Sequence, residues 1–176
     1  FTAFKAQTQL GRNLSLTGIA TLANTSMTRP SNSFINSASN VKSTSFSLIA
    51  NKRNLFGDDN VSFFISQPNR VDNGRLSIRL SNLAGSDGSL TYRNKSINLE
   101  PTASQLDYGL SYRKDLDEDI SFSIKHMVTS NLNHEQDSDD VSSSFIGARY
   151  KNLKVGLATN PIESQTNAEL SYSYKF

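Results

Sequence analysis

The amino-acid sequence predicts an all-β protein, an antiparallel up-and-down β-barrel of about 12 strands. Apolar residues recur at every second position in short runs, which is the period of a strand with one apolar and one polar face. The 176 residues include 10 Phe and 6 Tyr although only 36% are hydrophobic, a balance that suits strands with one wet face. The same alternation fits a soluble β-sandwich or jelly roll, in which two sheets share an apolar core.

Length and composition narrow the alternatives further. A chain of 176 residues has the length of one domain, and we treat residues 1–176 as a single β-domain. It has no cysteine, which excludes disulfides and thiolate metal sites, and its formal charge of +2 gives no reason to expect nucleic acid as a partner. No apolar run reaches the roughly 18 residues of a membrane helix, so a bilayer-spanning form would have to be a barrel.

The last eleven residues, 166–176, alternate without interruption to the final residue. Terminal residues usually fray, so a strand that stays in register to the last aromatic is unusual. The pattern resembles the closing strand of bacterial outer-membrane β-barrels, which ends in Phe. This resemblance implies that the apolar side of the strand is an assembly signal, formed by Leu170, Tyr172, Tyr174 and Phe176.

The other strands follow from short alternating runs between clusters of Gly, Asn, Asp and Pro. We expect them at residues 1–10, 14–23, 43–53, 61–66, 75–81, 90–99, 105–113, 119–129, 141–150 and 153–159. A change of phase between Tyr92 and Ile97 predicts a bulge near Lys95. Pro68 and Asn73-Gly74 predict a turn over residues 67–74, and the Ser/Asn-rich residues 24–42 have no periodicity and predict a long surface loop.

The connections supply a test independent of the strand patterns. Counted back from the C-terminus of a barrel, the outer connections are residues 160–165, 131–140, 100–104, 67–73 and 24–42. The inner connections are residues 151–152, 114–118, 83–88, 54–60 and 11–13. The two longest connections both fall on the outer side, as in bacterial barrels. Two features disagree with a barrel. Residues 61–66 are shorter than the 9 to 11 residues of a membrane strand. The expected strands also number about eleven, whereas bacterial single-chain barrels have even strand numbers, so one strand would be missing at the N-terminus or miscounted.

Charged residues on the polar sides of these strands are candidates for the lining of a hydrated lumen. They are Arg75, Arg79, Arg93, Asp107, Lys125, Glu169 and Lys175.

A more specific resemblance comes from three segments in the middle of the chain. They read Ser-Gln-Pro-Asn-Arg-Val-Asp-Asn-Gly at residues 66–74, Leu-Glu-Pro at residues 99–101 and Gln-Leu-Asp-Tyr-Gly-Leu-Ser-Tyr at residues 105–112. Together with the terminal aromatic, they resemble the C-terminal region of subtilisin-like serine proteases of the autotransporter type, from Gram-negative bacteria. The resemblance covers about the last two-thirds of the chain and departs at Asn69, where the family more often has an apolar residue.

No protease chemistry is visible in the chain itself. A Ser-His-Asp triad needs a His that is oriented by a buried Asp and faces a Ser. The two histidines are His126, within a predicted strand, and His134, in a polar loop. We therefore expect no catalytic residue, no cofactor and no hydrolysis of peptides or esters by this chain alone. Residues 134–140 carry clustered oxygen ligands that could hold Ca²⁺, but they lack the spacing of a calcium loop and fit a solvated charge run better.

The expected function is physical rather than chemical. We expect an outer-membrane barrel domain that anchors or translocates an N-terminal passenger, which the resemblance implies is a protease. Its expected partners are outer-membrane lipid, the barrel-assembly machinery and its own passenger, at the bacterial outer membrane or cell surface. The chain begins Phe1-Thr2-Ala3 without a signal peptide, so we expect it to be cut from a longer precursor. The alternative is a soluble β-sandwich that serves as a binding or assembly module of a secreted surface protease.

Overall fold

A computed structural model describes residues 1–26, 34–84, 88–160 and 165–173 of the chain. Within these residues the fold is all-β and antiparallel, as the sequence predicts, with one 3₁₀ turn at Leu132–His134. The strands are β1 Thr2–Gln9, β2 Leu14–Thr25, β3 Ile35–Ala38, β4 Val41–Arg53, β5 Asp59–Asn73, β6 Arg75–Ala84, β7 Leu90–Asn98, β8 Leu106–Asp115, β9 Ile120–Ser130, β10 Val141–Tyr150, β11 Leu153–Asn160 and β12 Gln165–Tyr172.

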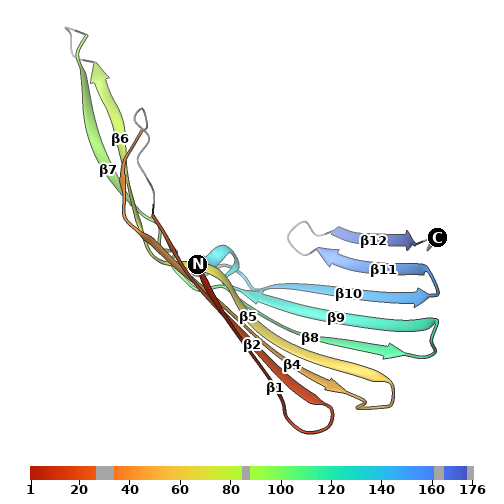
Figure 1. Cartoon of the computed structure of the whole chain (residues 1–176). Helices are drawn as coiled ribbons and strands as arrows, with labels where there is room; N and C mark the ends of the chain where they lie inside the picture. Colours follow the sequence, from red (N-terminus) through yellow and green to blue (C-terminus); the bar gives the residue numbers. More distant parts are fainter. Residues whose placement is uncertain (27–33, 85–87, 161–164, 174–176) are drawn as a thin grey trace.

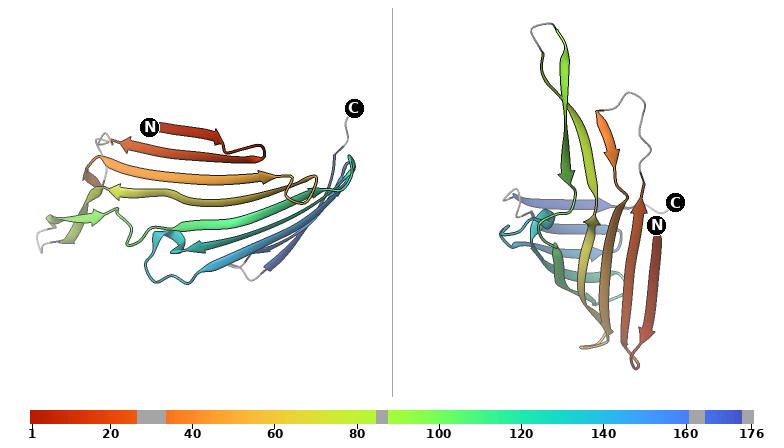
Figure 2. Two further views of the ribbon diagram at one scale, coloured as in Figure 1. Left: turned by 90° about the horizontal axis from the view of Figure 1, so that it is seen from below. Right: turned by 90° about the vertical axis from the view of Figure 1, so that its left-hand side faces the viewer.

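Nine of these strands form one large sheet in the order β1-β2-β4-β5-β8-β9-β10-β11-β12, and every neighbouring pair is antiparallel. The sheet is an up-and-down arrangement that is strongly curved (Figures 1 and 2). Its edges are β1 and β12, which do not pair with each other in the described part of the chain. The closed barrel therefore remains a proposal.

The other three strands form a separate sheet in the order β3-β6-β7. This sheet, here called the arm, projects from one end of the large sheet (Figure 1). Residues 67–74 were expected to be a turn, but β5 continues through Pro68 to Asn73. Pro68 is tolerated because the pairing of β4 with β5 shifts between Phe46–Gln67 and Thr44–Arg70. At such an irregularity a residue without an N–H leaves no ladder bond unmade.

The arm also changes the place of one expected connection. The two rims of the large sheet differ. One of them, here called the short-turn rim, carries the tight turns at residues 10–13, 54–58, 116–119 and 151–152. Residues 83–88 were expected on this side. Instead β6 and β7 lead away from the opposite rim, so that Leu83 and Ala84 lie toward the far end of the arm, whereas residues 85–87 are outside the described part (Figure 1).

Two local expectations along the arm also need correction. The expected loop at residues 24–42 contains β3 and the start of β4, and its residues 27–33 are outside the described part. The expected bulge near Lys95 is absent, because Lys95 pairs regularly with Ile78. The irregularity lies instead between Ser81 and Ala84 in β6. The change of phase in β7 has a simpler cause: the whole strand is exposed, so neither of its faces has to be uniformly apolar.

The pairing register divides the large sheet into two chemically different faces. Directly paired residues of antiparallel strands point to the same side. Following the pairs from β1 to β12 collects most of the large apolar side chains on one side, here called the apolar face. Its members include Phe4, Leu22, Phe46, Leu48, Phe63, Ile65, Leu110, Ile124, Ile146, Leu157 and Leu170.

The opposite side, here called the polar face, is rich in Ser and charged residues and is the less exposed of the two. Ser43, Ser121 and Thr129 on this face are buried, whereas Leu110 and Leu157 on the apolar face are 51% and 52% exposed. This difference is what the concave and convex sides of a curved sheet produce. No hydrophobic side chain is buried anywhere in the described residues. The sandwich alternative required a shared apolar core, and the described part of the chain contains none.

Candidate functional site: the two faces of the large sheet

The apolar face is continuous across strands that are far apart in the sequence. One row of paired side chains runs from Leu48 through Ile65 and Tyr108 to Val128. A second row continues across the other half of the sheet, through Ile124, Ile146, Leu157 and Ala168. Leu170 and Tyr172, two residues of the expected assembly signal, extend the same face on β12, and Tyr174 and Phe176 lie outside the described residues.

One polar pair interrupts the apolar face. His126 on β9 is directly opposite Ser144 on β10, and its Nδ1 lies 2.9 Å from the Ser144 hydroxyl oxygen. Each side chain thus offers the other a hydrogen-bond partner, and the Thr159 hydroxyl on β11 bonds the Ser144 backbone beside them. None of the hydrogen bonds in the described part of the chain joins His126 to a carboxylate, so this pair lacks the Asp that would complete a triad.

Tyrosines gather on the apolar face close to the short-turn rim. Tyr150 is the last residue of β10 and Tyr172 the last of β12, and both flank Leu153 at the start of β11. Tyr112 lies on the same face three residues before the end of β8. A ring with an apolar body and a polar tip suits the boundary between an apolar layer and water. This end of the apolar face therefore has the chemistry of such a boundary.

The seven charged candidates for a lumen do not lie on one surface. Asp107, Lys125 and Glu169 share the polar face. Arg75, Arg79 and Arg93 lie on β6 and β7 of the arm, and Arg79 and Arg93 point to opposite sides of it. Lys175 is outside the described residues. The sequence predicts the arm arginines to lie with the others because apolar and polar residues alternate in β6 and β7 as in the strands of the large sheet. This alternation does not reveal which sheet a strand joins.

Two aromatic rings on the polar face lie over glycines of neighbouring strands. A Cβ added to Gly109 on β8 would lie 2.8 Å from the ring of Phe64 on β5. A Cβ at Gly147 or Gly156, which pair with each other across β10 and β11, would lie 2.7 or 2.8 Å from the ring of Phe145. Real side chains do not make such short contacts, so each ring occupies space that only glycine leaves free. Lys125 extends over the outer side of the Phe64 ring, 5.3 Å from its centroid.

A polar network organises the rim opposite the short turns. Arg70, near the end of β5, donates from Nε to the carbonyl of Ala103 at 3.0 Å and from a terminal nitrogen to Asp72 at 2.9 Å. A second terminal nitrogen lies 3.8 Å from Glu100. The guanidinium thus fixes the segment that returns from the arm to β8. Two of the three segments that carry the family resemblance, residues 66–74 and 99–101, thus meet at this side chain.

The network continues to the connection between β9 and β10. The side chains of Gln105 and Thr129 both donate to Asp107, at 2.9 and 2.8 Å. The backbone N–H of Gln105 donates to Nδ1 of His134 at 2.8 Å, and Ala103 donates to the His134 carbonyl at 2.9 Å. Both histidines are thus engaged in structural hydrogen bonds. The network is not predicted from the sequence, although the short spacing of Arg70 and Asp72 on one side of a strand is a usable signal.

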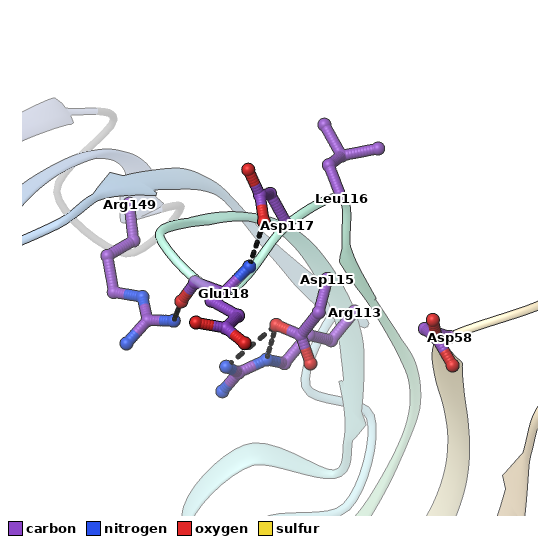
Figure 3. A pocket seen from close by; sticks show the side chains of 7 residues that line it. All are labelled: Asp58, Arg113, Asp115, Leu116, Asp117, Glu118 and Arg149. Atoms are coloured by element: carbon purple, nitrogen blue, oxygen red, sulfur yellow. Dashed lines mark hydrogen bonds and ion pairs between the residues drawn. The ribbon is translucent and has the colours of Figure 1, made fainter.

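A charged pocket lies at the short-turn rim, between the turn after β8, the turn before β5 and β10 (Figure 3). Its lining residues are Asp58, Arg113, Asp115, Leu116, Asp117, Glu118 and Arg149. Arg113 donates twice to Asp115, at 3.1 and 2.9 Å, and Arg149 donates to the Glu118 carbonyl at 3.4 Å. Four carboxylates and two guanidinium groups line the pocket, so its lining has a formal charge of −2.

The other candidate sites from the sequence have no support in the structure. Within the described ranges no three His, Asp or Glu side chains are grouped closely enough to hold a metal ion, which includes the acidic residues 134–140. None of the described segments forms a helix with the length and apolar character needed to cross a membrane. Comparison of the chain with protein-family models, with curated proteins and with solved structures finds no match in any of the three.

Proposed function

We propose that this chain is a membrane-spanning β-domain of the bacterial outer membrane that anchors or translocates an N-terminal passenger. The observation that carries the proposal is the apolar face, which is continuous over nine strands and is covered by nothing in the described chain. A soluble sheet of this size would leave far more apolar surface in water than monomeric proteins tolerate. Hydrocarbon is a medium in which such a face is stable, while the polar face lines a hydrated interior.

Strand length supports the same proposal. A tilted membrane strand needs about 9 to 11 residues. The shortest strand expected from the sequence, at residues 61–66, is part of β5, which has 15 residues. Strands β2, β4, β8, β9 and β10 have between 10 and 13 residues. Length was the main objection to a membrane barrel: β5 meets it, whereas β1, β11 and β12 have 8 residues each, just below this range.

Strand direction determines how such a sheet can close. In nine alternating antiparallel strands, the first and the last run the same way, so β1 and β12 could pair with each other only in parallel. Bacterial single-chain barrels are antiparallel and have even strand numbers. Closure in that style therefore requires an odd number of further strands between the two edges.

The passenger and the assembly machinery are the proposed macromolecular partners. The basis for the passenger is the family resemblance, which implies a subtilisin-like protease upstream of this domain. The basis for the assembly machinery is the alternating C-terminal strand, with Leu170 and Tyr172 on the apolar face. We propose no catalytic role for the chain itself and no nucleic-acid partner.

The experiment expresses the chain behind a signal peptide, with a small reporter domain fused before Phe1, in a Gram-negative host. The fraction of protein in the outer membrane and the exposure of the reporter to external protease are measured. The test variant is Leu110→Arg, at the centre of the apolar face, and the matched control is Ser111→Arg, the next residue on the polar face. A lipid-facing Arg costs about 2–4 kcal/mol near the bilayer midplane, so membrane yield should fall for Leu110→Arg alone.

One outcome of this experiment would reject the proposed function. Folded protein that is recovered in buffer without detergent, with equal yields for both Arg variants, would reject the membrane domain. It would favour the soluble binding or assembly module, with the apolar face covered by protein instead of lipid.

A further inference from the structure

The arm carries four cationic side chains. Arg75 and Arg79 on β6 and Arg93 and Lys95 on β7 form no ion pair with any described residue. The acidic residue of this hairpin, Asp87, is outside the described part. Outside the arm, Arg70 is paired with Asp72 and Glu100, Arg113 is paired with Asp115, and Arg149 donates to the Glu118 carbonyl. The arm is thus a positively charged element that projects away from a nearly neutral sheet.

The cations are spread along both sides of a thin ribbon. Arg75 and Arg79 lie on the same side, four residues apart, which is about 13 Å along a strand. Arg93 and Lys95 lie on the other side, opposite Leu80 and Ile78. Every residue of β7 is exposed. Such a surface suits an extended polymer with spaced charges rather than a small ligand.

An aromatic ring accompanies the charges. The Arg79 guanidinium carbon lies 4.0 Å from the centroid of the Tyr92 ring, and Tyr92 is 52% exposed. Stacking orients the guanidinium plane and leaves its outer edge available to a carboxylate. The remaining exposed part of the ring can pack against the apolar face of a sugar.

We propose that the arm binds an acidic polysaccharide, a polymer of sugars that bear carboxylates, with Arg79, Arg93 and Lys95 on the carboxylates and Tyr92 against a sugar ring. Spaced charges favour this ligand over nucleic acid, whose phosphates are denser, with one negative charge per about 1.7 Å of duplex. The exposed ring favours it over an acidic peptide, which needs cations alone. The proposal goes beyond membrane anchoring and does not depend on it, since the arm lies outside the large sheet.

The test measures binding of the full folded chain to polygalacturonate, with neutral dextran, poly-L-glutamate and oligo-dT as comparison probes. The double variant Arg79→Gln with Arg93→Gln should bind polygalacturonate about five- to tenfold more weakly, because two exposed charge contacts are lost. The matched control, Arg12→Gln with Arg53→Gln, removes the same charge at the short-turn rim, and its affinity should stay within about twofold.

Tyr92→Leu separates recognition of sugar from simple attraction of charge. It keeps every cation and should weaken polygalacturonate binding while leaving the weaker binding of poly-L-glutamate unchanged. Resistance of each variant to proteolysis is compared first, so that an unfolded arm is recognised. The proposal is overturned if both double variants lose affinity equally, if polygalacturonate binds no better than dextran, or if poly-L-glutamate or oligo-dT binds as tightly.

Discussion

At the scale of single residues, the large sheet depends on contacts between strands, because the described residues include no buried apolar core. Two kinds of side-chain contact join its strands: aromatic rings that lie over glycines, and the polar network around Arg70. Both join residues far apart in the sequence, such as Phe64 with Gly109 and Arg70 with Ala103. Substitutions at both kinds of contact should therefore change the stability of the folded chain in a predictable direction.

Gly109→Ala should destabilise the folded chain by about 1–3 kcal/mol, the usual cost of overpacking. The added methyl group would collide with the backbone carbonyl oxygen of His126 and would lie 2.8 Å from the Phe64 ring, so that both must move. The control is Gly18→Ala, also within a strand, whose Cβ would meet nothing closer than Leu48 Cδ1 at 3.8 Å. Since alanine loses less backbone entropy than glycine, this control should be neutral or gain up to about 1 kcal/mol. The measurement is the urea midpoint in detergent, and equal midpoints for the two variants would contradict close packing around Gly109.

Arg70→Lys should lower the free energy of unfolding by about 1–3 kcal/mol. Lysine retains the charge but cannot reach Ala103, Asp72 and Glu100 together, and bonds to charged groups contribute about 1.5–3 kcal/mol each. Arg113→Lys is the control, since its partner Asp115 is about half exposed and such pairs contribute at most about 1 kcal/mol. Proteolysis should open residues 99–105 in the first variant only. Cleavage there at the same rate in both would show that Arg70 does not hold the segment.

At the scale of elements, the sequence predicts strands well and their pairing partners poorly. The expected strand at residues 141–150 coincides with β10, and most other expected strands agree with the structure within about three residues. Alternation is a local property, so it finds strands but not neighbours. It could not reveal that β6 and β7 leave the large sheet to join β3. The turn predicted at Pro68 was wrong because the missing N–H of proline matters only where a ladder hydrogen bond is required. The shifted register of β4 and β5 requires none at this position.

The C-terminal strand gives a prediction about assembly rather than stability. If Phe176 is read by the assembly machinery, its deletion should reduce the yield of membrane-inserted chain much more than the stability of chain already folded. Pulse-chase fractionation after export measures the first quantity, and the urea midpoint of refolded protein the second. A loss of stability of about 3–5 kcal/mol with unchanged insertion is the result expected of an ordinary buried aromatic, and it would contradict the signal.

At the scale of the whole molecule, the curved sheet has one polar and one apolar face, and the two faces are stable in different media. The register alone places Leu48, Ile65, Tyr108 and Val128 in one row, although they come from four strands. Sequence alternation predicted these sides strand by strand, and the lumen candidates Asp107, Lys125 and Glu169 do share one face. It could not predict the edges, the arm or the rings over glycine, since each depends on which distant segments meet.

The most direct test of the central claim, that the apolar face meets lipid, measures contact with hydrocarbon residue by residue. The chain has no cysteine, so a single Cys introduced at Leu110, Ser111, Ile124 or Ser123 carries a unique fluorescent label. The labelled chain is refolded into bilayers with brominated acyl chains, which quench fluorophores that touch them. Membrane anchoring predicts strong quenching at 110 and 124 and weak quenching at 111 and 123. Equal, weak quenching at all four positions, in protein that remains folded, would contradict it.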